Sequence, residues 1–394
     1  MTATGFGRGR KTGGARLAVQ RRWAGGFSPM RRVDPLLLLS VLALCGFGLL
    51  LVYSATHVRL ESVGRDPMAY VNQQLVSALL GVGVAGAVLS VDYRLFRAWA
   101  PLLYLATMLS LGGVLLVGET VRGATRWIDI GPLTLQPAEL AKPMLVLMLA
   151  TLFHERREEA LGLRALIEAL VIGAIPTVLI VLQPDLGTAI VFVAITCGVL
   201  LMARVKVRYL CALVAIGASS LVAVFQLGLL ADYQMERLDT FLSGPGSQGL
   251  QGSGYNVNQA EIAVGSGQLS GRGLFEGTQT SLSFVPENHT DFIFTVVGEE
   301  LGFLGAVLLL GLYAVMLWRS LVIAGTARDT LGTLIASGIA TVFAVQMFVN
   351  VGMSIGPMPA TGLPLPLVSY GGTNLIGSML MVGLLENVAM RRRM

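Results

Sequence analysis

The 394-residue sequence has few charged residues, few histidines and few cysteines. Charged residues make up 13% of the chain, against about 25% in an average soluble domain, which leaves too few charges to cover the surface of a soluble enzyme. The three cysteines have no CxxC spacing, which excludes a disulfide framework; we expect Cys45, Cys197 and Cys211 to be buried as small apolar side chains. The sequence also lacks a Walker motif, an HExxH motif and a Rossmann fingerprint in a suitable context, so we expect neither a nucleotide cofactor nor a recognisable zinc site.

Apolar residues are abundant instead. Hydrophobic residues make up 54% of the chain, and the mean hydropathy is +0.72. This composition predicts an all-α polytopic membrane protein, whose outer surface faces lipid. The net charge of +5 is typical of basic cytoplasmic loops in a membrane protein, so we do not expect a nucleic-acid partner.

The apolar segments predict about ten transmembrane helices, because a helix needs roughly 20 apolar residues to cross a bilayer. With both termini in the cytoplasm, cytoplasmic segments hold 21 Lys or Arg residues and outer segments hold 6, with Lys142 at the mouth of the fourth span. This asymmetry follows the positive-inside rule. The expected spans lie near residues 35–54, 72–91, 98–117, 140–154, 166–182, 186–203, 208–230, 292–318, 331–352 and 366–389.

The segments outside the spans divide the chain. Residues 1–33 hold eight Lys or Arg residues, and we expect a disordered basic cytoplasmic tail before a retained first helix. Residues 34–394 then form a single integral membrane domain. The longest connection, 230–291, is expected outside the cell between the seventh and eighth helices. The segment 356–366 has four prolines, which forbid a regular helix, so it must be buried in protein or line a cavity.

Four groups of polar residues stand near the ends of spans. In the first, Arg122 and Arg126 precede Trp127, and Glu139 and Lys142 are spaced i, i+3. Cations at this depth suit a pyrophosphate or a lipid phosphate. The alternative is an interfacial anchor beside a structural ion pair.

The other groups are dominated by carboxylates. Asp185 is expected to cap the helix that follows it. If a helix begins near 287, Glu287 and Asp291 share one face, and a partly desolvated carboxylate there is a candidate general base; the alternative is helix capping by solvated acids. For Glu300 we favour an internal ion pair, with Lys142 as the candidate partner, over catalysis. Glycines at 265, 267, 271 and 273 would form either an anion-binding nest or plain turns.

Taken together, these residues resemble the SEDS proteins (shape, elongation, division and sporulation), the family that includes RodA, FtsW and SpoVE. Two segments, 183–186 and 277–280, are more similar to the RodA branch. The matching motifs run in family order along nearly the whole chain: Arg-Gly-Ala-x-Arg-Trp-Ile at 122–128, Gln-Pro-x-Glu-x-x-Lys at 136–142, Gln-Pro-Asp-x-Gly-Thr at 183–188, Ala-x-Gly-Ser-Gly at 263–267, His-Thr-Asp-Phe-Ile-Phe at 289–294, Gly-Glu-Glu-Leu-Gly at 298–302 and Thr-Gly-x-Pro-Leu-Pro-x-Val-Ser-Tyr-Gly-Gly at 361–372.

The resemblance implies a peptidoglycan glycosyltransferase in the bacterial plasma (inner) membrane. It would polymerise lipid II on the outer leaflet during cell elongation, within the elongation machinery, with a class B penicillin-binding protein that cross-links the strands. The family's essential aspartate falls on Asp291. A divalent cation, Mg²⁺ or Mn²⁺, is a further expectation. The residues expected to bind substrate are Lys142, Glu139, Arg122, Arg126, Trp127, His289, Glu300 and Ser369.

The implied mechanism is an inverting glycosyl transfer. Asp291 would take the proton from the acceptor 4-hydroxyl, and undecaprenyl pyrophosphate would leave as Lys142 with Arg122 or Arg126 neutralises its charge. Two alternatives stay open: a lipid II flippase or other transporter, and a non-catalytic scaffold for the penicillin-binding protein. The acidic residues cluster on the outer side rather than at the membrane midplane, which favours surface chemistry.

Overall fold

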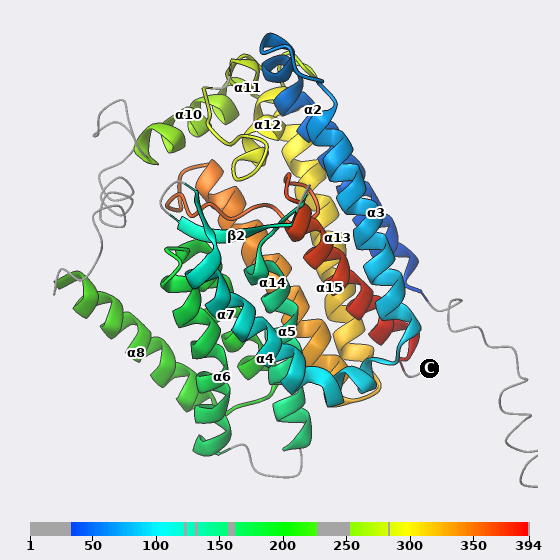
Figure 1. Cartoon of the computed structure of the whole chain (residues 1–394), viewed down its shortest axis with the longest axis vertical. Helices are drawn as coiled ribbons and strands as arrows, with labels where there is room; N and C mark the ends of the chain where they lie inside the picture. Colours follow the sequence, from blue (N-terminus) through cyan, green and yellow to red (C-terminus); the bar gives the residue numbers. More distant parts are fainter. Residues whose placement is uncertain are drawn as a thin grey trace, which may run out of the picture.

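The protein is an α-helical bundle in our computed structural model, which describes residues 33–121, 124–130, 133–156, 162–226, 253–282 and 284–392. Most of the basic tail expected over 1–33 therefore lies outside the described residues. Figure 1 shows the long helices running side by side along the bundle. Ten long helices occur in the described ranges: α2 (Pro35–Ser62), α3 (Ala69–Ser90), α4 (Tyr93–Val117), α5 (Pro137–Glu155), α6 (Leu163–Val181), α7 (Leu186–Met202), α8 (Val207–Gln226), α13 (Gly302–Thr326), α14 (Thr330–Ser354) and α15 (Gly372–Met390).

These helices confirm a polytopic helical membrane protein, and each expected span corresponds to one of them. Seven helices in the described ranges are long and apolar enough to cross a membrane, and α7 is a shorter apolar helix. Two boundaries differ from expectation. The eighth span is divided into α12 (Ile293–Glu300) and α13, because Gly302 adopts a left-handed φ of +62° that ends one helix before the next begins. The tenth begins at Gly372 rather than near 366, because the proline-rich segment continues to that point.

Aspartates fix where four of the helices begin. Asp34, Asp92, Asp185 and Asp329 precede α2, α4, α7 and α14, and each accepts a hydrogen bond from a backbone N–H of the first turn. Such a side chain satisfies one of the N–H groups that a helix leaves without an internal partner. The expected capping role of Asp185 is therefore confirmed.

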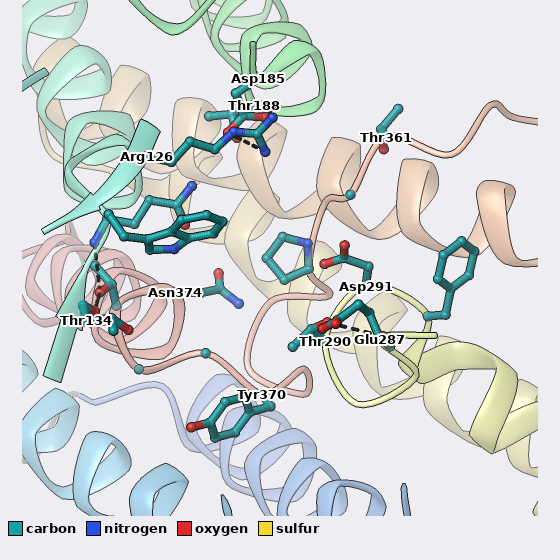
Figure 2. Close-up of a pocket in the computed structure, with 18 of the residues that line it drawn as sticks. Arg126, Thr134, Asp185, Thr188, Glu287, Thr290, Asp291, Thr361, Tyr370 and Asn374 are labelled. Atoms are coloured by element: carbon teal, nitrogen blue, oxygen red, sulfur yellow. Dashed lines mark hydrogen bonds and ion pairs between the residues drawn. The ribbon is translucent and has the colours of Figure 1, made fainter. Parts of the chain in front are cut away.

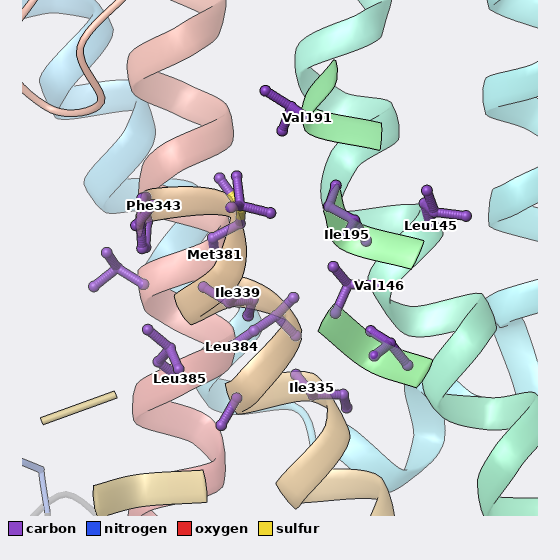
Figure 3. Close-up of a cluster of buried hydrophobic side chains, with 14 of the residues drawn as sticks. Leu145, Val146, Val191, Ile195, Ile335, Ile339, Phe343, Met381, Leu384 and Leu385 are labelled. Atoms are coloured by element: carbon purple, nitrogen blue, oxygen red, sulfur yellow. The ribbon is translucent and has the colours of Figure 1, made fainter. Parts of the chain in front are cut away.

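The core lies where α5, α7, α14 and α15 meet (Figure 3). Side chains such as Leu145, Ile195, Phe343 and Leu385 are completely buried there. Helix α3 lies directly against α15, and a Cβ at Gly383 would stand 2.9 Å from the Cα of Ala85. Small residues allow this close approach, and the resulting van der Waals packing helps to hold the two helices together inside a membrane.

The two ends of the described chain meet at one end of the bundle. The Asp34 backbone N–H donates to Glu386 Oε2 at 2.9 Å, and the Asp34 carboxylate pairs with Arg319 and, at 3.6 Å, with Arg392. Burial opposes the ionised Asp34 carboxylate, but the bonds from Arg319 and the Leu37 N–H outweigh it and lower its pKa. This arrangement agrees with termini on the same side of the membrane.

The opposite end carries short elements that were not expected (Figure 1). An antiparallel sheet of order β1-β2-β3 is formed by β1 (Glu119–Val121), β2 (Ala124–Ile130) and β3 (Leu133–Leu135). The long connection contributes α10 (Ser253–Ser266) and α11 (Thr278–Ser281), which contact α12. The expectation of an all-α chain is therefore correct for the bundle and incomplete at this end.

The structure decides between the two alternatives for the glycines in favour of turns, and it contradicts the expected burial of the cysteines. The backbone N–H groups of Gly271 and Gly273 donate to carbonyls of Gly267 and Glu300, so these glycines pack against the end of α12 and do not form an anion-binding nest. Cys197 and Cys211 are exposed on α7 and α8 and only Cys45 is partly covered, because apolar side chains on membrane helices also face lipid.

Candidate active site

A cavity of about 440 Å³ lies among the short elements, at the end of the bundle opposite the described termini (Figures 1 and 2). Its walls come from the start of α3, from β2 and β3, from the starts of α7 and α15, from α10, and from the segments 286–292 and 360–364. Its lining is rich in hydroxyl, amide and carboxyl groups. These are Gln73, Arg126, Trp127, Thr134, Gln136, Asp185, Thr188, Asn256, Pro286, Glu287, Thr290, Asp291, Phe292, Ala360, Thr361, Gly362, Pro364, Tyr370, Gly371, Gly372, Thr373 and Asn374.

Asp291 is positioned in this cavity by its backbone. It lies in a turn just before α12, and Asn350 Nδ2 donates to its carbonyl and to that of Leu363, both at 2.7 Å. Its side chain extends away from α12 and into the cavity (Figure 2). Gly362 stands opposite with a left-handed φ of +71°, and a Cβ there would be 3.3 Å from Asp291 Oδ2. The proline-rich segment thus leaves room beside this carboxylate, as a cavity-lining segment should.

Glu287 and Asp291 line the same cavity, although no helix places them there. Helix α12 begins at Ile293, and residues 287–292 form a turn in which the N–H groups of Asp291 and Phe292 donate to the Glu287 carbonyl. Thr290 Oγ1 donates to Glu287 Oε2 at 3.3 Å. The two carboxylates therefore face one space, as expected, but through a turn rather than a shared helix face.

Arg126 is held against the start of α7. Its guanidinium lies 3.6 Å from Asp185 Oδ2, and it donates to the carbonyls of Gln183 and Pro184. Asp185 in turn accepts bonds from the backbone N–H and the hydroxyl of Thr188. Arg126 and Asp185 thus form one wall of the cavity, with the half-buried Trp127 next along β2.

Tyr370 forms the wall opposite, together with α3. Its hydroxyl donates to Gln73 Oε1 at 2.7 Å, and burial, with a smaller effect from Tyr70, raises the pKa of Tyr370 to about 12. Its N–H donates to the carbonyl of His289, whose ring lies 5.2 and 5.7 Å from the rings of Tyr70 and Tyr370. His289 is buried behind this aromatic wall and is not among the cavity-lining residues.

Three of the other expected substrate residues, Lys142, Glu139 and Ser369, are buried and are not among the cavity-lining residues. Lys142 Nζ donates to Glu139 Oε1 at 2.7 Å, and their side chains are 0% and 2% exposed. Ser369 Oγ accepts from the Leu365 N–H at 2.8 Å, which braces the proline-rich segment. Arg122 lies outside the described residues.

The internal ion pair expected for Glu300 is not what the structure has. Ser54 Oγ donates to both Glu300 carboxylate oxygens at 2.6 Å, and the Phe275 N–H donates to Oε2 at 3.2 Å. Lys142 pairs with Glu139 instead. Glu299 accepts from the N–H groups of Gln279 and Thr280. Both glutamates therefore fasten the 273–281 segment to α12 and α2.

Several lining residues gave no signal in the sequence. Gln73, Asn256 and Asn374 come from three distant helices, and only the tertiary fold brings them together. Asn374 lies two residues after the last matching motif, so a search for polar residues at the buried start of the tenth span would have found it. In the described ranges, no group of three or more His, Cys, Asp or Glu side chains is arranged to hold a metal ion.

Comparisons with known proteins give a consistent result. Residues 35–394 match the sequence profile of the FtsW, RodA and SpoVE family, described as "Cell cycle protein". The chain is 37% identical over 362 residues to peptidoglycan glycosyltransferase MrdB of Escherichia coli, covering 92% of this chain and 95% of the relative.

Solved structures extend the similarity to the fold. The Thermus thermophilus rod shape determining protein RodA aligns with a TM-score of 0.67 and 31% identity, covering 92% of this chain and 98% of that one. A chain from a structure described as the structural coordination of polymerization and crosslinking by a peptidoglycan synthase complex aligns with a TM-score of 0.77 and 32% identity, covering 91% and 97%.

Proposed function

The chain belongs to the FtsW, RodA and SpoVE family of cell cycle proteins, and we propose that it is a peptidoglycan glycosyltransferase of the plasma membrane. Its reaction is the polymerisation of lipid II into glycan strands on the outer face of that membrane during cell elongation. The name of the E. coli relative supports this activity, and the similarity to RodA supports the elongation role. The single observation that carries the proposal is the polar cavity with Asp291 in its wall, opposite the end where the described termini meet.

Asp291 acts as the general base in this proposal. Its carboxylate takes the proton from the 4-hydroxyl of the acceptor sugar as that oxygen attacks the anomeric carbon of the donor. The bond between that carbon and the pyrophosphate breaks, the configuration inverts, and undecaprenyl pyrophosphate leaves with the bonding electrons. Base catalysis of this kind contributes about 10²–10⁴-fold to a rate. The hydroxyl and amide groups of the lining suit two sugars in contact with Asp291.

The leaving group must be neutralised in a cavity that is itself acidic. The described lining holds Asp185, Glu287 and Asp291 against Arg126. Two oxygen-bearing side chains in one turn, Glu287 and Asp291, fit a Mg²⁺ ion, which typically takes one or two carboxylates and completes its shell with substrate phosphates and water. Glu287 and Asp291 would hold such an ion, which would supply positive charge to the pyrophosphate leaving group. Arg126 lines the same cavity, and its positive charge also stabilises the departing pyrophosphate.

The protein has a cross-linking partner in this proposal. A structural relative is described as part of a complex that coordinates polymerization and crosslinking. A class B penicillin-binding protein, a transpeptidase, fits that description, and it uses the glycan strand as it leaves the cavity. The remainder of the elongation machinery acts through this pair.

Polymerisation of purified lipid II by the protein with its partner tests the proposal. Moenomycin is added so that contaminating transglycosylases are silent, and glycan strands are resolved on a gel. We expect strands from the wild type and none from folded Asp291→Ala protein. Glu61→Ala, which removes an exposed carboxylate from the end of α2, is the matched control and should retain wild-type activity.

The two alternatives give different results in the same experiment. A transporter would move labelled lipid II across a vesicle membrane, and a scaffold would only bind the partner. Absence of strands from the wild type, with the partner bound and lipid II present, would overturn the proposed activity in favour of one of them.

A further inference from the structure

The start of helix α15 opens into the cavity. Gly371, Gly372, Thr373 and Asn374 are all lining residues, and no side chain caps the helix. The first turn of any helix has N–H groups with no acceptor inside the helix, and the helix dipole adds positive potential there. Because Gly371 has no side chain, and a Cβ there would meet only the Cβ of Asn374 at 3.5 Å, a ligand can approach these N–H groups closely. This geometry favours an anion, but it needs independent support.

Asn374 supplies that support. Its side chain lines the cavity and is only 3% exposed, yet neither Nδ2 nor Oδ1 has a hydrogen-bond partner. Figure 2 shows its amide extending into the cavity between β2 and Tyr370. A buried amide without partners is unfavourable, because it has lost its hydrogen bonds to water. By contrast Asn387, near the other end of α15, donates to the carbonyls of Val88 and Val91 and accepts from the Tyr93 N–H. The amide of Asn374 is therefore free to bind a ligand in the cavity.

The unpaired amide limits what the ligand can be. Nδ2 and the helix N–H groups require acceptors, and Oδ1 requires a donor. A glycosyl diphosphate has both side by side: phosphate oxygens accept, and the sugar's hydroxyl or acetamido groups donate. The nearby cations already have partners, since Arg126 contacts Asp185 and two carbonyls, and Lys142 is paired with Glu139. The start of α15 thus offers uncommitted donors near these paired cations.

Hydrogen bonds hold the first turn of α15 rigidly. Thr373 Oγ1 donates to the Thr134 carbonyl at 2.7 Å and accepts from the Gln136 N–H at 3.2 Å. The Gly371 N–H donates to Gln74 Oε1 at 3.2 Å. These bonds tie the first turn of α15 to β3, to the start of α5 and to α3, so binding does not have to order it.

We infer that residues 372–374 form the diphosphate subsite of the donor lipid, and that Asn374 recognises the glycosyl diphosphate group. Asn374 Nδ2 donates to a phosphate oxygen, and Oδ1 accepts from the sugar attached to it. This inference rests on the proposed function, because it takes the ligand class from a lipid-linked donor, but its test is a binding measurement that does not depend on turnover.

The test compares two substitutions of Asn374. Asn374→Leu removes both polar atoms at similar volume, and Asn374→Asp replaces the donor with a carboxylate that repels phosphate. Asn258→Asp makes the same exchange at a half-buried position of α10 that does not line the cavity. Binding of undecaprenyl diphosphate is titrated in nanodiscs with EDTA present, so that a metal ion cannot substitute for the lost donor. Undecaprenyl monophosphate and phosphatidylglycerol distinguish the diphosphate from other lipid phosphates.

We expect a Kd for undecaprenyl diphosphate that is about tenfold to hundredfold weaker in both Asn374 variants, with Asn258→Asp unchanged. Wild-type protein should bind the monophosphate and phosphatidylglycerol at least tenfold less tightly. Asn374→Leu should melt at the wild-type temperature or above, because it removes an unsatisfied buried amide, whereas Asn387→Leu should melt lower.

Two results would overturn the inference: undecaprenyl diphosphate binding within threefold of wild type in a folded Asn374 variant, or equal wild-type binding of phosphatidylglycerol. Normal binding by these variants in a chain that still polymerises lipid II would refute the subsite and leave the proposed function intact. Failure of the wild type to polymerise would refute the proposed function instead.

Discussion

The buried pair of Glu139 and Lys142 allows a quantitative prediction. The two groups are 2.7 Å apart, and their side chains are 2% and 0% exposed. At this separation the attraction is about 6 kcal/mol for an effective dielectric constant of 20. Removing one partner leaves the other charge buried, which typically costs 3–5 kcal/mol, whereas removing both charges is often neutral. We therefore expect Lys142→Met to lower the unfolding free energy by about 3–5 kcal/mol, and Glu139→Gln with Lys142→Met to regain at least half of that loss.

The assay is thermal unfolding of the single and double variants in one detergent, with undecaprenyl diphosphate binding measured alongside. Arg94→Met is the matched control, because Arg94 also pairs with an aspartate, Asp329 at 3.0 Å, but its side chain is 44% exposed. An exposed pair contributes about 0–1 kcal/mol, so this variant should melt close to the wild type. A Lys142→Met protein as stable as Arg94→Met, or a double variant no more stable than the single, would refute the reasoning. A stable double variant that fails to bind would show that Lys142 also acts on the ligand.

Two further predictions concern a glycine and an aspartate. Gly362→Ala should reduce polymerisation at least tenfold in a gel assay, because φ is +71° and the new Cβ would stand 3.3 Å from Asp291 Oδ2. The control, Gly311→Ala on an open helix face, should be neutral. Equal activities of the two variants would contradict this prediction. Arg319 lowers the pKa of Asp34 in the folded state. The ionised Asp34 carboxylate therefore stabilises the folded protein fully above the ordinary carboxyl pKa of about 3.9, and this contribution is lost as the pH falls through the lower folded pKa. The melting temperature should thus fall in acid for the wild type and less steeply for Asp34→Asn, and parallel curves would count against it.

The bundle could be predicted from the sequence because bilayer thickness fixes the length of each apolar run. Charge asymmetry then oriented the spans, and the structure agrees that both ends lie on one side. The predictions that failed concern local features of the chain. The break before Gly302 depends on the backbone conformation of that glycine, which the apolar runs on either side of Glu299 and Glu300 do not reveal. Strands β1, β2 and β3 lie in the connection between α4 and α5, where the alternation of apolar and polar residues is too short to predict a strand.

The cavity could be predicted only in part. Asp291, Arg126 and Trp127 lie in recognisable motifs, and the structure brings them to one space. Lys142 has the charge expected of a phosphate ligand, but a sequence cannot show that Glu139 already satisfies it. Asn374 was missed for the opposite reason: its polarity is visible in the sequence, but only the structure shows that its amide lacks partners.

The most direct test of the central claim is the turnover of lipid II by Asp291→Asn. This variant keeps the shape and the hydrogen-bonded backbone of residue 291 but cannot accept the proton. We predict a polymerisation rate about 10²–10⁴-fold below wild type, with the Kd for undecaprenyl diphosphate, measured with EDTA present, within threefold and an unchanged melting temperature. A rate within tenfold of wild type would contradict the assignment of Asp291 as the base.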